Sequence, residues 1–193
     1  MAGQNLFCFD GGGAYPDYPL CLPLLPEAAK SGYASEQELV SAIEEKQARL
    51  GGELESVLSV VVGLLLETQI KCAIDFRVKS LDSILLKMAV KKRPLEEVHD
   101  LLGIRLMVAS VKDCYRLANL LHREFDFVPS KFDDYIARPK NGYRSIHTTL
   151  KWRGNILCEV QIRTHEMHHE AENGHTSHLH YKAAMLQRAA NLT

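Results

Sequence analysis

Three short segments of this sequence carry side chains that hold phosphate or a divalent metal ion in proteins. They read Arg-Val-Lys-Ser at residues 77–80, Asp-Leu-Leu-Gly-Ile-Arg at 100–105 and Glu-Val-Gln-Ile-Arg-Thr at 159–164. Carboxylates bind hard divalent cations, and guanidinium and ammonium groups bind phosphate. Together the three segments predict a site for a nucleoside triphosphate and its metal ion.

The basic residues of the first segment lie where a strand is expected to give way to a helix. Arg77 ends the predicted strand, and Ser80 begins the predicted helix. The free backbone N–H groups at the helix start, together with Arg77 and Lys79, predict a point that binds an anion. Lys87 lies further along that helix near the same face, although a lone lysine there is also typical of a solvated surface charge.

The acidic residues lie on or beside predicted strands. Asp100 precedes a buried strand, and Glu159 lies within another, where an unpaired carboxylate would cost several kcal/mol. Mg²⁺ takes few protein ligands and leaves room for phosphate oxygens, so two carboxylates on neighbouring strands predict a magnesium site. The alternative is a buried ion pair between Glu159 and Arg163. Arg105 lies within the strand that follows Asp100, where it either lines a cleft or forms an ion pair.

A further segment, Gly-Tyr-Arg-Ser-Ile-His at 142–147, has side chains suited to a second nucleotide. Tyr143 offers a ring on which a base can stack, and Arg144 and His147 can reach phosphate. Gly142 permits a close approach of the backbone. Taken alone, a tyrosine at the start of a strand is also typical of a core or rim residue.

The bulk composition is that of a soluble globular protein with one domain. The chain has 193 residues, of which 46% are hydrophobic and 24% charged, and its net charge of -1 argues against a protein that coats nucleic acid. The five cysteines form no Cys-x-x-Cys pair, and no basic residue precedes Lys30, so we expect a reducing cytoplasm and no signal peptide. The longest apolar run, residues 57–66, is too short to cross a membrane.

Residues 1–34 differ from the rest and are expected to form a Pro/Gly-rich N-terminal arm. Four of the seven prolines lie between residues 16 and 26, a spacing that excludes helix and favours extended conformations. The segment is also rich in Leu and Tyr, which is unusual for a free linker. We expect an arm that lies on the domain surface. The alternative is a plug over the active site or a docking strip for a partner.

Residues 35–193 are expected to form the main domain. Ser35 and Glu38 match a capping box, so a helix should begin there, continue to Leu50, break at Gly51-Gly52 and resume. Strands are predicted at 70–77, 103–109, 144–152 and 156–163, and helices at 53–68, 80–90, 111–125 and from about 165 past 181. Residues 153–155 are expected to form a turn that joins the last two strands as a hairpin. The pattern predicts an α+β fold with a mixed β-sheet flanked by helices.

These motifs resemble, in type and order, those of the RelA/SpoT-type (p)ppGpp synthetase family over about residues 54–182. Besides the segments above, the resemblance includes Lys-Phe-Asp-Asp-Tyr-Ile at 131–136 and Asn-Gly-Tyr-Arg-Ser-Ile-His-Thr-Thr at 141–149. It implies a nucleotidyltransferase-like synthetase fold. It also implies transfer of the β,γ-pyrophosphate of ATP to the 3′-hydroxyl of a guanine nucleotide, GDP or GTP, to make (p)ppGpp.

The resemblance also implies a role for individual residues. ATP would be bound by Arg77 and Arg105 on either side of the adenine and by Lys79, Ser80 and Lys87 at its phosphates. Mg²⁺ would be held by Asp100 and Glu159, with Glu159 also near the attacking hydroxyl. The acceptor nucleotide would be bound by Lys140, Tyr143, Arg144, His147, Gln161 and His168. The chemistry is consistent, because this transfer needs charge neutralisation and alignment more than covalent catalysis.

The sequence departs from the family pattern in several places. It resembles a stand-alone small alarmone synthetase without a hydrolase half, and Asp133 brings it closer to the synthesis-only type. Residues 139–142 are one residue shorter than the usual acceptor loop. Residues 174–180 are rich in histidine where the family has small and apolar residues. The histidines between His165 and His180 are interpreted mainly as acceptor-side or solvated residues, and a transition-metal site is the alternative.

Two other functions fit the same motifs. One is a toxic relative that uses adenine nucleotides or the 3′ end of tRNA as acceptor, and an antitoxin protein would then be its partner. The net charge near zero disfavours tRNA. The other is an inactive nucleotide-binding module, which would be expected to lack a carboxylate or the Arg-x-Lys-Ser segment, and neither is lost. The sequence is compatible with a monomer or an oligomer.

Overall fold

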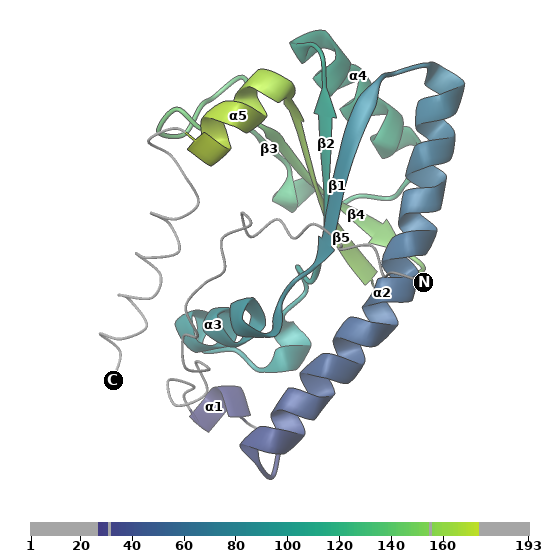
Figure 1. The fold of residues 1–193 in the computed structure, drawn as a ribbon. Coiled ribbons are helices and arrows are strands. Elements are labelled where there is room, and N and C mark those ends of the chain that lie inside the picture. The colour runs from purple at the N-terminus through teal and green to yellow at the C-terminus, as the bar shows by residue number, and fades with distance from the viewer. Residues whose placement is uncertain (1–26, 31, 155, 174–193) are drawn as a thin grey trace, which may run out of the picture.

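The computed structural model describes residues 27–30, 32–154 and 156–173 (Figure 1). Its α-helices are α1 (Glu27–Lys30), α2 (Glu36–Thr68), α3 (Leu81–Lys91), α4 (Val111–Glu124) and α5 (His165–Asn173). The short 3-10 helices are η2 (Leu95–Glu97) and η3 (Pro129–Lys131). The strands are β1 (Cys72–Val78), β2 (Leu102–Val108), β3 (Asp133–Asp134), β4 (Ile146–Trp152) and β5 (Ile156–Thr164).

The described strands form one mixed sheet in the order β1-β2-β5-β4-β3. Strands β2 and β5 pair in parallel, whereas the pairs β1–β2, β5–β4 and β4–β3 are antiparallel. The predicted α+β class with a mixed sheet is therefore confirmed, and so is the hairpin formed by β4 and β5. The parallel pair places two strands that are far apart in the sequence side by side at the centre of the sheet.

One face of the sheet is apolar and packs against α2 and α4, whereas α3 and α5 lie towards the other side (Figure 1). On the central strands, Ile104 and Val160 are completely buried on the apolar face. Leu117 and Leu121 of α4 are equally buried, and they belong to the same apolar cluster. Because alternate residues of a strand point to opposite sides, the core leaves the second face free for polar side chains.

Helix α2 is one continuous helix of 33 residues, so the predicted break at Gly51-Gly52 is wrong. Leu50, Leu54 and Val57 are buried at helical spacing on both sides of the glycines. A glycine costs a helix about 1 kcal/mol relative to alanine, whereas burying one large aliphatic side chain contributes about 1.5–3 kcal/mol. The apolar stripe therefore outweighs the low helix propensity of the glycine pair.

The start of α2 has the predicted cap. The Ser35 side chain accepts a hydrogen bond from the Glu38 backbone N–H at 3.1 Å. The Glu38 carboxylate in turn accepts from the Ala34 backbone N–H at 2.6 Å, which is one residue before the expected capping-box donor. The Tyr33 hydroxyl donates to Glu96 at 2.8 Å, so the end of the predicted arm is attached to η2.

The other predicted elements are present, and their ends differ by two residues or fewer. Strand β4 begins at Ile146 rather than at Arg144, and β3, α1, η2 and η3 were not predicted. Most of the arm, the turn residue Asn155 and the predicted helix beyond Asn173 lie outside the described residues. Among the described helices, none is both long and apolar enough to cross a membrane.

Helix α5 is attached to the sheet through buried charges. One carboxylate oxygen of Glu172 lies 3.1 Å from Arg105 Nη1 and 3.1 Å from Arg163 Nη2. These arginines are only 4% and 1% exposed. Asp75 adds a second carboxylate at 3.6 Å from Arg105 Nη1. Since a buried charge is tolerated only beside a compensating charge, Glu172 allows both arginines to lie beneath α5.

Replacing Gly52 by alanine should stabilise the protein by about 0.5–1 kcal/mol, because alanine loses less conformational entropy in a helix. A Cβ atom at this position would meet nothing within 4 Å. Gly154→Ala is the control, since its φ of +86° disfavours any side chain and the variant should be destabilised. Urea unfolding of both variants measures the two effects. Destabilisation by Gly52→Ala would contradict a continuous α2.

Replacing Glu172 by glutamine should destabilise the protein by about 1–3 kcal/mol, because Arg105 and Arg163 lose a shared counter-charge. The expected loss is below that of a fully buried pair, since the Glu172 side chain is 27% exposed. Glu166→Gln, at an exposed position of the same helix, should change the free energy of unfolding by less than about 0.5 kcal/mol. Equal unfolding midpoints for the two variants would show that the ion pairs do not hold α5.

Candidate active site on the polar face of the sheet

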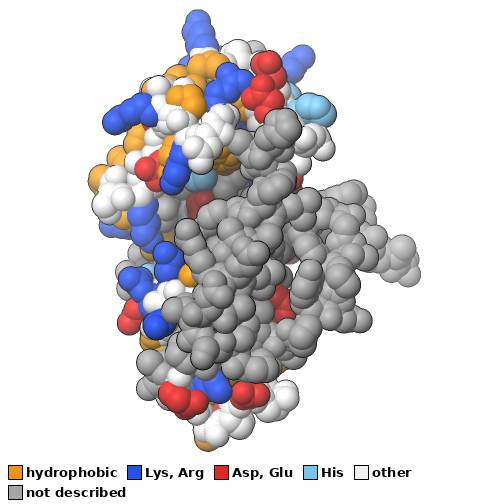
Figure 2. Space-filling view, turned by 90° about the vertical axis from the view of Figure 1, so that its left-hand side faces the viewer, with side chains coloured by type: hydrophobic (Ala, Val, Ile, Leu, Met, Phe, Trp, Pro, Cys, Tyr) orange, Lys and Arg blue, Asp and Glu red, His pale blue; other side chains and the backbone are white. Residues whose placement is uncertain are grey.

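The face of the sheet opposite the core carries charged and polar side chains in two rows. One row contains Arg77, Gly103, Glu159 and Thr149 on β1, β2, β5 and β4. The next row contains Asp75, Arg105, Gln161, His147 and Asp133 on β1, β2, β5, β4 and β3. Figure 2 views the molecule from the side on which α3 and α5 lie, and its described surface carries Lys, Arg, Asp and Glu side chains.

The two predicted metal ligands, Asp100 and Glu159, lie in the same cleft. Glu159 is on β5, and Asp100 precedes the neighbouring strand β2 by two residues. Both line a narrow cavity that also contains Arg77 and Gln161. Both also line a larger cleft of about 320 Å³, to which Lys87 contributes. The structure thus brings the two carboxylates to one side of the sheet.

Two lysines from the first segment and its helix neutralise Asp100. Lys79 Nζ lies 3.3 Å from Asp100 Oδ2, and Lys87 Nζ forms an ion pair with the same oxygen. Burial alone would raise the pKa of Asp100, but the charges of the two lysines outweigh it and hold that pKa below its usual range. Burial also lowers the pKa of Lys79. Asp100 is therefore ionised and lies beside the cations that a phosphate would need.

Ser80 is the N-cap residue of α3, as expected, although its side chain does not cap the helix. Its hydroxyl instead lies 2.9 Å from the Ser83 hydroxyl. The Lys79 backbone N–H donates to the Leu101 carbonyl at 2.7 Å. This bond fixes the start of α3 against the segment that carries Asp100, so the helix N-terminus and the carboxylate belong to the same site.

Arg77 and Arg105 lie on the same face of the neighbouring strands β1 and β2. The Arg77 side chain crosses over Gly103, where an added Cβ atom would lie 3.6 Å from its Cγ. Arg105 Nε donates to the Gln161 side-chain oxygen at 3.3 Å. Its Nη1 pairs with the carboxylates of Asp75 and Glu172. Burial lowers the pKa of Arg105 to about 10, which still leaves it charged at neutral pH. Of the two predicted settings for Arg105, the structure has the ion pair.

Glu159 is held by neutral polar groups rather than by Arg163, which pairs with Glu172. Gln161 Nε2 donates to Glu159 Oε1 at 3.1 Å, and His147 Nδ1 lies 3.7 Å from the same oxygen. The predicted alternative of a Glu159–Arg163 ion pair is therefore wrong. Glu159 carries no close cationic partner among the described residues other than His147, whose pKa is lowered by burial.

An aromatic cluster lies beside the carboxylates. The Tyr143 hydroxyl and His147 Nε2 are 2.8 Å apart, and the two rings meet edge to face. Tyr135 meets the ring of Tyr143 and that of His147 at centroid distances of 5.9 and 5.3 Å. Burial raises the pKa of Tyr143. A tight turn precedes the cluster, with Asn141 and Gly142 at positive φ.

Three of the predicted acceptor residues do not line the two cavities that contain Asp100 and Glu159. Lys140 is exposed at the turn. Arg144 forms an ion pair with Glu170 of α5 at 2.9 Å. His168 belongs to α5, and its Nδ1 lies 2.6 Å from Nη2 of the buried Arg163. These residues thus belong to the turn or to α5, or pair with α5, whereas Gln161 and His147 contact Glu159 and Tyr143 contacts His147.

The sequence did not single out four residues that contribute to the site. They are Asp75, His99, Tyr135 and Glu172. Asp75 precedes Arg77 by two residues, and a two-residue period along a strand predicts a shared face. Glu172 follows His168 by four residues, a helical spacing that also predicts a shared face. His99 is the sequence neighbour of Asp100, and Tyr135 lies within the 131–136 segment, but no periodic pattern distinguishes either residue.

The donor set suits Mg²⁺. Asp100 and Glu159 offer carboxylate oxygens, and Mg²⁺ accepts one or two carboxylates when phosphate oxygens and water complete its shell. No group of three or more His, Cys, Asp or Glu residues in the described part of the chain is placed to hold a metal ion by itself. The site therefore fits a metal that arrives together with a nucleotide better than one held by protein ligands alone.

Comparison with known proteins agrees with this site. Residues 76–185 match the family described as a region found in RelA / SpoT proteins. A probable chloroplastic GTP diphosphokinase, RSH3 of Arabidopsis thaliana, is 50% identical over 107 residues, which are 55% of this chain and 15% of that protein. A GTP pyrophosphokinase of Streptomyces coelicolor is 37% identical over 156 residues, 80% of this chain and 18% of that protein.

Solved structures show the same fold. The small alarmone synthetase 2 of Bacillus subtilis is 28% identical with a TM-score of 0.61, covering 73% of this chain and 81% of that chain. The small alarmone synthetase 1 of the same organism, bound to its product pppGpp, is 31% identical with a TM-score of 0.51, covering 75% and 77%. The chain spans less than a fifth of the length of the two curated relatives above. The family match covers more than half of the chain, and the protein therefore belongs to the RelA/SpoT family.

Proposed function

We propose that this protein is an ATP-dependent pyrophosphokinase that transfers the β,γ-pyrophosphate of ATP to the 3′-hydroxyl of a guanine nucleotide, making (p)ppGpp. One observation carries the proposal: Asp100 and Glu159 come from distant segments and line the same cleft. Lys87, whose ammonium group is of the kind that binds phosphate, lines that cleft as well. The names of the relatives, GTP diphosphokinase and GTP pyrophosphokinase, support the same reaction.

The phosphates of ATP fit the cationic end of the cleft. Lys79 and Lys87 already converge on Asp100, and the N-terminus of α3 lies next to them. Mg²⁺ held by Asp100 and Glu159 would neutralise phosphate charge and align the triphosphate. The lysines, released in part from Asp100, would then bind phosphate oxygens.

The adenine of ATP fits between Arg77 and Arg105. Arg77 pairs with Gly103 across the two strands, and Arg105 follows Gly103 by two residues on the same face. Such diagonal neighbours are about 7–8 Å apart, which suits one aromatic ring between two planar guanidinium groups. Arg105 is already held in place by Asp75 and Glu172, so little side-chain entropy is lost when the base binds.

The acceptor nucleotide fits the aromatic side of the cleft, with its base on Tyr143 and its 3′-hydroxyl at Glu159. Gln161 and His147 hold Glu159 so that one oxygen can accept the hydroxyl proton. The 3′-oxygen forms a bond to the β-phosphorus of ATP as the bond from that phosphorus to the α,β-bridging oxygen breaks. AMP leaves with that oxygen, and the proton remains on Glu159 until it passes to solvent.

The acceptor could instead be an adenine nucleotide or the 3′ end of tRNA, and the shortened loop at 139–142 is the feature that favours this second reading. A toxic activity of that kind would require an antitoxin partner. We place either reaction in a reducing cytoplasm, where ATP is abundant. The described cysteines are Cys72, Cys114 and Cys158, and each is free.

The acceptor can be identified by incubating the protein with Mg²⁺ and ATP labelled in the β or γ phosphate. GDP, GTP, ADP, AMP and tRNA are offered one at a time. Labelled product is expected with GDP or GTP, at a rate at least tenfold above that with the other acceptors. Label that enters only tRNA, or only an adenine nucleotide, would contradict the guanine assignment and support the alternative.

Replacing Glu159 by glutamine should lower kcat/KM about 10³-fold, because it removes a metal ligand and the proton acceptor together. The shape of the side chain is kept, so the free energy of unfolding should change by less than about 1 kcal/mol. Glu166→Gln serves as the matched control and should keep its activity. Activity of Glu159→Gln within tenfold of the unsubstituted protein would reject the role of this carboxylate.

A further inference from the structure

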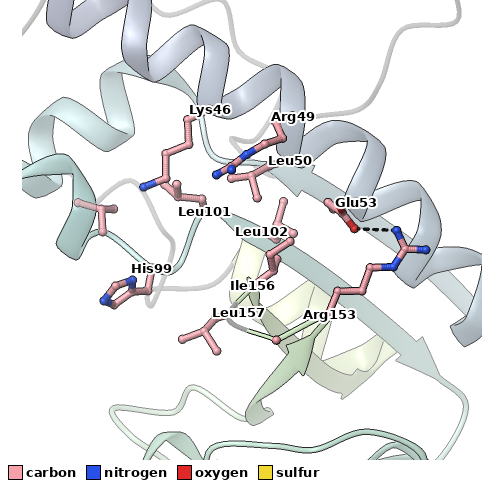
Figure 3. A pocket seen from close by; sticks show the side chains of 12 residues that line it. Lys46, Arg49, Leu50, Glu53, His99, Leu101, Leu102, Arg153, Ile156 and Leu157 are labelled. Carbon is pink, nitrogen blue, oxygen red and sulfur yellow. Dashed lines mark hydrogen bonds and ion pairs between the residues drawn. The ribbon is translucent and has the colours of Figure 1, made fainter.

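A second pocket lies beneath α2, outside the cleft described above (Figure 3). We call it the α2 pocket, and its volume is about 550 Å³. Its walls come from three places: one side of α2, the segment 98–102 before and at the start of β2, and the hairpin between β4 and β5. The described lining residues are Lys46, Arg49, Leu50, Glu53, Val98, His99, Leu101, Leu102, Arg153, Gly154, Ile156 and Leu157.

Three cationic side chains line the α2 pocket. Lys46 and Arg49 extend from α2, and Arg153 extends from the hairpin towards Glu53 (Figure 3). Arg153 lies 3.5 Å from Glu53, the one carboxylate in the described lining. Arg49 makes no hydrogen bond or ion pair with the described part of the chain. Lys46 uses one donor for the Leu95 carbonyl at 3.1 Å, and burial lowers its pKa. The pocket thus has an excess of positive charge that its own residues do not compensate.

The inner wall of the α2 pocket is aliphatic. Leu50, Leu101 and Leu102 are at most 5% exposed, and Ile156 and Leu157 are half-buried. The described lining contains no Phe, Tyr or Trp, and the ring of His99 is its one aromatic group. Because most of this wall is aliphatic, an aliphatic body fits it, and the cations in the lining select an acidic head group.

We propose that the α2 pocket binds a small organic anion, an aliphatic chain that carries a phosphate or carboxylate. Arg49 and Lys46 bind the head group, and the leucines contact the chain. Binding there does not depend on the proposed catalytic activity, so the two can fail independently.

The α2 pocket also shares a wall with the catalytic cleft. His99 and Leu157 line both, and His99 is the neighbour of Asp100. If the proposed function holds, an anion in the α2 pocket lies across this thin wall from the phosphates of ATP. Like charges then disfavour simultaneous binding, and the effect must be reciprocal.

The probe for this site is n-hexyl phosphate, titrated into the whole chain by calorimetry and by amide NMR shifts. Hexanoate tests the other acidic head group, hexanol tests the chain without charge, and inorganic phosphate tests charge without the chain. One saturable site is expected, with the amides of residues 49, 99 and 154 shifting most. Hexanol and inorganic phosphate should each bind at least tenfold more weakly than hexyl phosphate.

Arg49→Glu and Glu53→Gln should change this affinity in opposite directions, and Arg123→Glu is the control. Arg49→Glu should weaken hexyl phosphate binding at least tenfold, whereas Arg123→Glu, an equal charge reversal at an exposed position of α4, should leave it within twofold. Glu53→Gln should strengthen binding at least twofold, because it removes the negative charge that holds Arg153. The Trp152 ring N–H donates to the Glu53 carboxylate at 2.9 Å, and the side-chain oxygen of a glutamine can accept the same bond.

The result that would overturn the site is equal affinity in Arg49→Glu and Arg123→Glu, or amide shifts confined to residues 79–87 of the catalytic cleft. Coupling is tested by the Kd of a non-hydrolysable ATP analogue with and without saturating hexyl phosphate. This Kd should rise at least twofold in the unsubstituted protein and stay unchanged in Arg49→Glu. An unchanged Kd in both would overturn the coupling.

Discussion

The parallel pairing of β2 with β5 decides on which side of the sheet each charged residue lies. Gly103 pairs with Glu159 and Arg105 with Gln161, so both strands place their polar residues on one face and their apolar residues in the core. Side chains alternate with a period of two, so a shift by one residue would move Glu159 into the core and Val160 into the cleft. The burial of Ile104 and Val160 beneath α4 therefore protects the register on which the site depends.

This register gathers charged side chains on one face of the sheet, so their charges must be compensated there. A face that gathers several charges within a half-buried cleft needs counter-charges close by, because an unpaired buried ion costs several kcal/mol. Asp100 obtains them from two lysines, and Arg105 obtains them from Asp75 and Glu172. Glu159 differs, since its contacts are with the amide of Gln161 and the ring of His147. The carboxylate with the weakest compensation is the one proposed to take a proton and to share a metal.

The elements that could be predicted from the sequence are those marked by a periodic apolar pattern or by a helix-capping residue. Ser35 with Glu38, the stripes of Leu and Val, and the hairpin spacing predicted most elements to within two residues. The glycine pair at 51–52 led to the wrong prediction of a helix break. Local helix propensity contains no information on the tertiary packing of Leu50 and Leu54. Glu172 was missed for a related reason. Its partners are 67 and 9 residues away, and a pair formed by tertiary contact leaves little trace in a local pattern.

Helix α2 contributes no residue to the proposed chemistry, yet it positions two segments that do. The Gln47 side chain donates to the Lys79 carbonyl at 2.7 Å, and Lys46 donates to the Leu95 carbonyl ahead of Asp100. Adjacent residues of one helical turn thus hold the chain before α3 and the chain before β2, which carry the lysine and the carboxylate of one ion pair. Arg49 of the α2 pocket follows about one turn after Lys46, and Glu53 follows one turn later. Any ligand that moves this part of α2 therefore acts on both segments at once, so the helix is a second physical connection between the α2 pocket and the catalytic cleft, besides the wall that His99 and Leu157 share.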